Sequence, residues 1–481
     1  MTDLQNTPSA EALAEAGGPS GLGRGPAVAC DEYYQLSRRG FMALGSAAAA
    51  AAAFAPAWLP QISLARSYNA AAQDVIVQVY LRGACDGLSI VVPYNEPAYQ
   101  SARPLLKVNG PGVSGNNVLD LGTGSTAVSS TAPGNTVVFG LHAALAALMP
   151  AWNNSHMLLV QAAGLTNTNK SHFDAQRFME VGKINDPLLS SGWLGRHLAT
   201  VGPMQASAAV RAVSIADGLA RTLAGSPLAV PVPDLGNNTG ALPGLTNFVN
   251  YGLKGTSSTR IARQSSIAAM YNATTGPIRP AAQTTLSTIA LLNAIGASGY
   301  APAGSAVYPT TTLGNSLKST AALINANVGV EAVAIDYGGW DTHANQGGTS
   351  GIILGTSMYS TMATLGNAIG AFYNDVIAAR ARNVTVVIMS EFGRRVGENG
   401  TIGTDHGYGN VMMVLGRAVN GRRVMTNWPG MPTTAVPTNQ DLGVTIDYRD
   451  ILQEIVRVRL GNPDIASIFP GYTPVNRGVL L

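Results

Sequence analysis

Five short motifs place carboxylate, imidazole or hydroxyl groups in loops that follow apolar, strand-like runs. Their candidate functional residues are Asp86, Ser171, His172, Asp341, His343, Glu391, Asp405 and His406. Carboxylate oxygens and neutral imidazoles are the usual ligands of zinc, manganese and similar divalent ions. Two such ions a few ångströms apart can clamp the attacking and leaving oxygens of a phosphoryl or sulfuryl transfer. These residue types therefore indicate metal-dependent hydrolysis.

Spacing within the motifs supports ligation but does not settle it. Asp341 and His343 are two positions apart, so an extended backbone would direct both side chains to one side. Asp405 and His406 stand in a glycine-flanked loop. Either pair could equally be a hydrogen-bonded loop pair. Asp86 alone at a strand end could also be a loop hydrogen-bonder.

Glu391 follows the most strongly β-branched run of the chain, residues 384–389. A carboxylate at the end of a buried strand is costly unless its charge is compensated. We therefore expect Glu391 to pair with Arg394, with Arg395 or with a bound cation.

The remaining pattern predicts the elements that must position these residues. Strands are expected at residues 73–80, 157–161, 210–215, 332–335, 384–389 and 411–415, and helices at 142–148, 171–180, 357–381 and 447–460. Alternating strands and helices are typical of an α/β fold with a largely parallel central sheet flanked by helices. In such a sheet the carboxyl ends of the strands share one edge, so motifs distant in sequence can converge there.

Residues 66–481 are expected to form this one α/β domain. Within it, residues 222–330 are rich in Pro, Gly and Asn around two helical patches, 260–272 and 281–296. We interpret this part as a helical and loop insertion, or a lid, over the edge of the sheet. Residues 1–65 are not expected to be part of this domain.

Arg38 and Arg39 precede an alanine-rich run, residues 43–57, which is the pattern of a twin-arginine signal peptide. The run is too short and too weakly apolar for a stable transmembrane span, which needs about 20 apolar residues. Cleavage after residues 63–65 would leave a chain that starts near Arg66. The signal predicts recognition by the twin-arginine translocation machinery and a periplasmic or secreted location.

Charge and cysteine content narrow the function further. The formal charge is only +3, and no Lys/Arg cluster suggests a nucleic-acid partner. The two cysteines are Cys30 and Cys85, and Cys30 would leave with the signal. The exported protein would then form no internal disulfide.

Other reactive side chains are assigned to structure. Cys85 is expected to be a small packing residue. His142 is expected at the start of a short helix, and His156 and His197 in surface or packing positions.

The chain resembles a known family in a series of motifs that occur in the same order. They are the twin-arginine signal, Leu-Arg-Gly-Ala-Cys-Asp-Gly-Leu (81–88), Ser-His-Phe-Asp-Ala-Gln (171–176), Gly-Gly-Trp-Asp-Thr-His (338–343), Ser-Glu-Phe-Gly-Arg (390–394) and Thr-Asp-His-Gly (404–407). The family is the twin-arginine-exported domain-of-unknown-function family 1501 (DUF1501). It in turn resembles a distant branch of the alkaline phosphatase and sulfatase superfamily, which binds two metals at the edge of an α/β sheet.

This second resemblance implies roles for individual residues. Asp86 resembles the first-strand metal aspartate, Asp341 and His343 a later aspartate and histidine of one metal site, and His406 the last metal histidine. Glu391 falls where the superfamily usually has an Asp-His pair. Ser171 falls near the Ser or Thr nucleophile, with His172 as a rival at the same helix start.

The leading hypothesis is an exported hydrolase of phosphate or sulfate esters that uses a divalent ion, either zinc, manganese, calcium or magnesium. Ser171 would attack the phosphorus or sulfur, and Asp405 would join the ligands or support them. Arg394 and Arg82 could neutralise the anionic ester, because arginine matches such oxygens bidentately. Alternatively they would pair with Glu391 and Asp86.

Two other functions are weighed against it. The long insertion and the missing histidine after Glu391 favour a non-catalytic protein that binds an envelope component on a degenerate fold. A cofactor-loaded redox enzyme has less support, because the chain has no Gly-x-Gly-x-x-Gly turn or cysteine ligand set.

Overall fold

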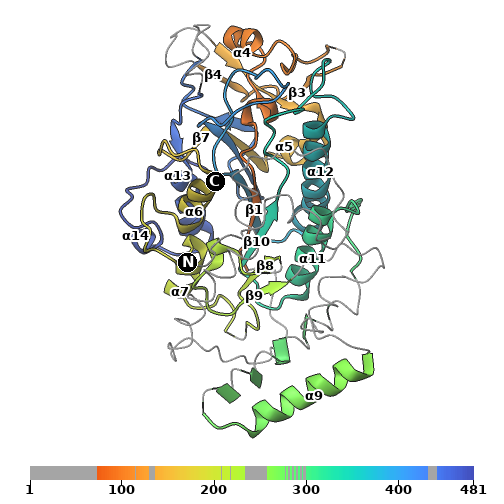
Figure 1. The fold of residues 1–481 in the computed structure, drawn as a ribbon, viewed down its shortest axis with the longest axis vertical. Helices are drawn as coiled ribbons and strands as arrows, with labels where there is room; N and C mark the ends of the chain where they lie inside the picture. The colour runs from red at the N-terminus through yellow and green to blue at the C-terminus, as the bar shows by residue number, and fades with distance from the viewer. Residues whose placement is uncertain are drawn as a thin grey trace, which may run out of the picture.

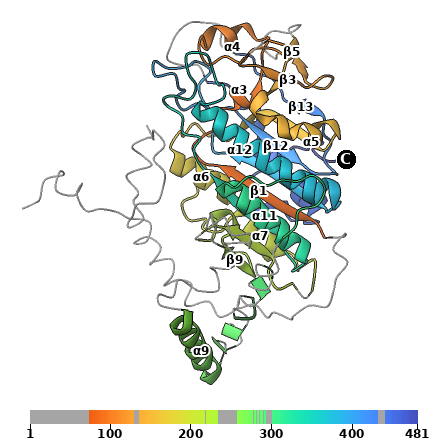
Figure 2. The same cartoon turned by 90° about the vertical axis from the view of Figure 1, so that its right-hand side faces the viewer.

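The computed structural model describes residues 73–481 apart from 114, 129–135, 207, 217, 233–256, 432–440 and several positions between 277 and 299. The predicted signal, residues 1–65, lies outside the described residues. Helices cover both faces of a large central sheet (Figures 1 and 2). The predicted α/β class is confirmed at this level.

Nine of the described strands form the main sheet, in the order β13-β7-β12-β11-β1-β10-β8-β9, with β14 beside β7. They are β1 (Val75–Leu81), β7 (Met157–Gly164), β8 (Ala212–Ile215), β9 (Ala229–Val232), β10 (Ala332–Tyr337), β11 (Val384–Ser390), β12 (Asn410–Leu415), β13 (Arg423–Met425) and β14 (Ile446–Asp447). The six predicted strands are all present. Most strand pairs of the sheet are parallel. The sheet is mixed because β12 runs antiparallel to both β11 and β7.

β1 lies at the centre, paired in parallel with β10 and β11. Alternate side chains of β1 enter two separate apolar cores: Val77 and Val79 face one, whereas Ile76 and Tyr80 face the other. Burial on both faces explains why this strand is a nearly continuous β-branched run and not an alternating one.

Two helical layers enclose the sheet (Figure 1). One contains α6 (His172–Val181), α7 (Trp193–Thr200), α13 (Tyr448–Glu454) and α14 (Ile465–Ile468). The other contains the 3₁₀ helix η3 (Ala143–Leu148), α5 (Met149–Asn153), α11 (Thr312–Ala326) and α12 (Ser357–Phe372). α12 and α13 continue into the π-helical turns η5 (Tyr373–Ala379) and η6 (Ile455–Arg459). None of the described helices combines the length and apolar character needed to cross a membrane.

Several short helices and strands lie outside the main sheet. They are α3 (Gly87–Ile90), α4 (Pro97–Ala102), η4 (Arg221–Leu223), and the strands β2 (Val91–Val92), β3 (Val118–Asp120), β4 (Thr126–Val128), β5 (Thr136–Val138) and β6 (Gly140–His142). β2, β6 and β3 form a second sheet, and β4 pairs with β5.

Two elements within residues 222–330, the range expected to be an insertion or lid, pack with the main sheet and its helices. At one end of this range β9 joins the main sheet beside β8. At the other end α11 packs on α12 and buries Leu313 and Leu317 in the core. Between them, α9 (Ser257–Ala273) lies away from the sheet in both views (Figures 1 and 2).

One edge of the sheet collects the candidate motifs. β1, β7, β10 and β11 run in the same direction, so their carboxyl ends meet there. β12 runs the other way, and therefore contributes the loop that precedes it. The sequence pattern indicates that His406 follows a strand. In the structure His406 instead reaches this edge in the loop before β12.

Candidate metal centre

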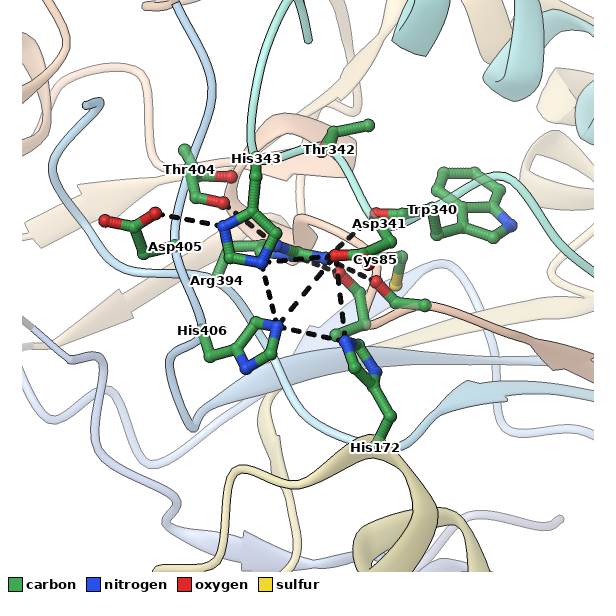
Figure 3. Close-up of polar contacts among 12 residues, drawn as sticks. Cys85, His172, Trp340, Asp341, Thr342, His343, Arg394, Thr404, Asp405 and His406 are labelled. Carbon is green, nitrogen blue, oxygen red and sulfur yellow. Dashed lines mark hydrogen bonds and ion pairs between the residues drawn. The ribbon is translucent and has the colours of Figure 1, made fainter. Parts of the chain in front are cut away.

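Three histidines, one from a helix start and two from loops, meet at this edge (Figure 3). His172 is the first residue of α6, after β7. His343 lies in the loop after β10, and His406 in the loop before β12. Nε2 of His406 is 3.0 Å from Nε2 of His172 and 2.9 Å from Nε2 of His343.

Asp341 adds a carboxylate to the three imidazoles. Its Oδ1 lies 3.3 Å from Nε2 of His343, 3.7 Å from Nε2 of His172 and 3.9 Å from Nε2 of His406. The ligand atoms of His172, Asp341 and His406 all lie within 4.8 Å of one another. The expected convergence of the later motifs is therefore found, and His172 belongs to the cluster as a potential ligand.

Two of the imidazoles are held from behind by carboxylates. Nδ1 of His172 is 2.8 Å from Oε1 of Glu391, and Nδ1 of His343 is 3.0 Å from Oδ1 of Asp405. An ionised carboxylate only accepts, so each Nδ1 carries the proton. In a neutral ring the Nε2 lone pair then points into the cluster. Carboxylate–histidine pairs of this kind orient metal-ligating imidazoles in known sites.

This arrangement fits a divalent ion. His406 has one Nε2 proton at most, and it contacts two other Nε2 atoms, so its proton can satisfy only one contact between neutral rings. A cation between the lone pairs removes the repulsion in the other contact. Nitrogen ligands about 2 Å from zinc lie about 3 Å from one another, close to the separations that the structure shows.

Burial and neighbouring charges shift the pKa values of His172, Asp341 and His406. Burial disfavours a charged His172, but the Asp341 and Glu391 carboxylates outweigh it and raise the pKa of His172 to about 9. Although burial favours the neutral acid, His172, His406 and Arg394 hold the pKa of the Asp341 carboxyl far below its ordinary value. Burial and the positive charge of Arg394 lower the pKa of His406. A proton on His172 thus occupies the place that a metal ion would take.

Arg394 is buried and holds the loops together. Its Nε donates to the carbonyl of Ala84 at 2.7 Å, and Nη1 to that of Thr404 at 2.9 Å. Nη2 donates to the carbonyl of Gly83 at 2.5 Å and to Oδ1 of Asp341 at 2.6 Å. The predicted pairing with Glu391 is not formed. Since its guanidinium is already engaged by these acceptors, Arg394 fixes Asp341 and is poorly placed to neutralise a substrate.

Gly83 allows this close packing. Its backbone φ is +112°, and an added Cβ would lie 2.6 Å from the amide nitrogen of Asp341. A side chain here would be strained and would push away the loop that carries Asp341.

Asp86, predicted as a metal ligand, instead forms an ion pair with Arg103. Arg103 binds both its carboxylate oxygens, with Nη1–Oδ2 at 2.5 Å and Nη2–Oδ1 at 3.0 Å. Ser89 and Gln346 donate to Oδ2, each at 2.6 Å. Its charge is compensated by a guanidinium, so Asp86 supports the loop and needs no metal.

Arg103 and Gln346 contact residues of the candidate motifs and were missed in the sequence analysis. Oε1 of Gln346 accepts from the hydroxyls of Thr342 (2.9 Å), between Asp341 and His343, and Thr404 (2.6 Å), two residues before His406. Gln346 therefore ties Asp86 to the two loops of the cluster. Arg103 lies outside these motifs, and Gln346 follows the Gly-Gly-Trp-Asp-Thr-His motif by three residues, so neither was singled out as a candidate.

Two other predicted residues have different surroundings. Arg82 pairs with Glu180 at 2.7 Å and with Asp336 at 2.9 Å, not with Asp86. Ser171 precedes α6: its N–H donates to Oδ1 of Asn169, and its hydroxyl makes no capping bond to the helix. It adjoins His172 in sequence, and its role as nucleophile stays a prediction.

The residues assigned to structure behave as expected. His142 is the N-cap of η3, and its Nδ1 accepts from the N–H of Ala144 at 3.1 Å. His156 contacts the Tyr373 hydroxyl, and His197 is buried against Asn462. Cys85 is fully buried.

Comparison with known proteins finds one family. A family model described as "Protein of unknown function (DUF1501)" matches residues 72–455, a range that includes every cluster residue. No curated protein matches the chain.

Proposed function

The chain belongs to the family of unknown function DUF1501, and from the geometry of its site we propose that it is a metal-dependent hydrolase with a single divalent ion. The ion would be held by His172, His343, His406 and Asp341. The observation that carries this proposal is the convergence of three Nε2 atoms, two of them on rings whose Nδ1 faces a carboxylate.

Zinc fits these donors best among the four ions considered. Imidazole nitrogens suit zinc, whereas calcium, magnesium and manganese prefer oxygen ligands. When bound, such an ion acidifies water and polarises an ester oxygen. The protein's own part is to keep the ligands ready. Glu391 and Asp405 hold protons at Nδ1 of two histidines, and Arg394 keeps Asp341 ionised.

A single ion is favoured because Arg103 stands beside Asp86. In the two-metal arrangement suggested by the alkaline phosphatase resemblance, Asp86 would bind a metal. Here both its oxygens face a buried guanidinium, and neither side chain is exposed. The permanent charge of Arg103 compensates Asp86 without a second ion.

Phosphate or sulfate esters remain the proposed substrates, on the strength of the resemblance to the alkaline phosphatase and sulfatase superfamily. Ser171 is the proposed nucleophile, because it is next to His172 at the start of α6, where the helix dipole favours developing negative charge. Arg394 and Arg82 are engaged with carboxylates, so substrate charge would be met chiefly by the ion.

The test is metal binding followed by turnover. The chain from residue 66 would be freed of metal, titrated with zinc against a chromophoric chelator, and assayed with aryl phosphates and aryl sulfates. We expect one zinc per chain and zinc-dependent release of the aryl alcohol. His406→Ala should abolish both, whereas His156→Ala, which alters a histidine beside Tyr373, should change neither. A wild-type protein that neither binds zinc nor turns over any ester contradicts the proposal.

A second candidate is a non-catalytic protein that binds an envelope component. Its support is that Arg82, Arg103 and Arg394 are all committed to internal carboxylates, which leaves little to bind an anionic ester. The double change Asp341→Ala with His343→Ala discriminates between the two. Loss of the cellular role with the fold intact supports metal chemistry, and its retention supports binding.

Export by the twin-arginine pathway to the periplasm or beyond is proposed from Arg38 and Arg39 and the alanine-rich run that follows. Replacing both arginines by lysine should leave the protein in the cytoplasm in its precursor form. Cell fractionation would show it, with an alanine-to-serine change outside the signal as control. Unchanged export of the variant excludes this route.

A further inference from the structure

One face of α6 carries a row of three polar residues, His172, Gln176 and Glu180, spaced four positions apart. Nε2 of Gln176 is 2.8 Å from Oε1 of Glu391, and Nδ1 of His172 is 2.8 Å from the same oxygen. Two side chains one helical turn apart therefore hold one carboxylate oxygen. The N–H of Gly83 is a third donor to it, at 2.8 Å.

Chemistry determines the orientation of the Gln176 amide. Its Oε1 is 3.3 Å from Nη1 of Arg82, which can only donate. Its other end faces the Glu391 carboxylate, which can only accept. The amide therefore has one orientation that satisfies both neighbours, with oxygen toward Arg82 and nitrogen toward Glu391.

Arg82 is itself anchored. Its Nη2 bonds Glu180, one turn further along α6, and Asp336 at the end of β10, and its guanidinium lies 4.0 Å from the centre of the Tyr80 ring. Leu81 and Ser390 are partners in the parallel pairing of β1 and β11, so Arg82 and Glu391 are the next residues of two neighbouring strands. α6 thus lies across both strand ends, and Gln176 joins them.

We propose that Gln176 is a positioning residue of the metal site. Linked to Arg82, it holds Glu391, and Glu391 in turn holds the His172 ring with Nε2 toward the cluster. This inference rests on the proposed metal binding. Gln176 contacts no cluster ligand directly in these hydrogen bonds, so it acts through Glu391.

Gln176→Met tests the proposal, because methionine keeps the length of the side chain and removes its hydrogen bonds. We expect the zinc dissociation constant to rise about 10-fold, the lower end of the range for residues that orient metal ligands. The visible spectrum of the cobalt-substituted protein should also change. Gln453→Met is the matched control, since the amide of buried Gln453 also makes hydrogen bonds in a helix, to Asp450 and Asn476.

A double-mutant cycle with Glu391→Gln separates positioning from general destabilisation. If Gln176 acts through Glu391, the double variant should bind zinc about as weakly as Glu391→Gln alone. If Gln176→Met does not fold, Gln176→Glu gives the same test, because it keeps the shape but places a second carboxylate beside Glu391. We expect it to weaken zinc binding at least as much.

The failures are distinguishable. Zinc binding by the wild type with an unchanged dissociation constant in both Gln176 variants overturns the positioning role and leaves the proposed function standing. Equal losses in Gln176→Met and Gln453→Met also overturn it. A wild-type protein that binds no zinc overturns both.

Discussion

Arg103 and Asp86 form a buried bidentate ion pair, with oxygen–nitrogen distances of 2.5 and 3.0 Å and no exposed side-chain surface. The sequence analysis predicted that Asp86 and Asp341 are both metal ligands, but the structure gives them different partners. Asp86 compensates a guanidinium, whereas Asp341 faces imidazole nitrogens.

Asp86→Asn should therefore reduce stability and spare the metal. Removing one partner of a buried ion pair leaves the other charge uncompensated, and we expect the free energy of unfolding to fall by about 3–5 kcal/mol. Zinc stoichiometry, measured on folded protein at low temperature, should stay at that of the wild type. Loss of zinc without loss of stability would show instead that Asp86 is a ligand.

The two carboxylates behind the histidines should differ in importance. Glu391 is fully buried and accepts from His172, Gln176 and Gly83, whereas the Asp405 side chain is 41% exposed. We expect Glu391→Gln to weaken zinc binding by about 10–100-fold. Asp405→Asn should have a smaller effect, because water can replace part of its contact with His343.

Competitive zinc titration measures both variants. Asp186→Asn, which removes the ion pair with Lys183 at 3.0 Å beyond the C-terminal end of α6, is the control for loss of a carboxylate that pairs with a lysine and not with a histidine. The reverse order, with Asp405→Asn the more harmful change, would contradict this account of the site.

The strands and the convergence of distant motifs could be predicted because both depend on local pattern. The β-branched run of β11 and its end at Glu391 are visible in the sequence. Once the sheet is taken as mostly parallel, its strand ends must share an edge. The approach of Asp341 and His343 to this edge follows from that geometry, whereas His406 reaches the edge in the loop before antiparallel β12.

What could not be predicted depends on tertiary contacts. The antiparallel direction of β12 is a property of its pairing with β11 and β7, and a strand's own residues do not encode its direction. Arg103 stands in a segment without any motif, so its ion pair with Asp86 was not foreseen. β9 and α11 were not predicted as separate elements, because the Pro, Gly and Asn content of the segment between them dominates the composition of residues 222–330.

Cys85 should be inert in the folded protein. It is fully buried, and burial raises the pKa of its thiol to about 12, so almost no thiolate exists at pH 8. In a Cys30→Ser background, a thiol-reactive chromophore should label the native chain far more slowly than the chain in denaturant. Rapid stoichiometric labelling under native conditions would show that this strand end opens readily.

His142 should make stability depend on pH. Burial lowers the pKa of His142 from 6.5 to about 4, while Nδ1 accepts from the N–H of Ala144. Between these two values the unfolded chain binds a proton that the folded chain does not, so stability falls as the pH falls. From pH 7.5 to 5.0 this single group costs about 2 kcal/mol of unfolding free energy.

His142→Asn isolates that contribution. Asparagine is a favoured helix N-cap and can accept from the same N–H, but it does not titrate near neutral pH. Other groups that titrate in this interval, including His197, are present in both proteins. Urea denaturation at the two pH values should show the wild type losing about 2 kcal/mol more than the variant. Equal losses would mean that His142 takes up its proton without unfolding, and that its buried ring is not held neutral by the fold.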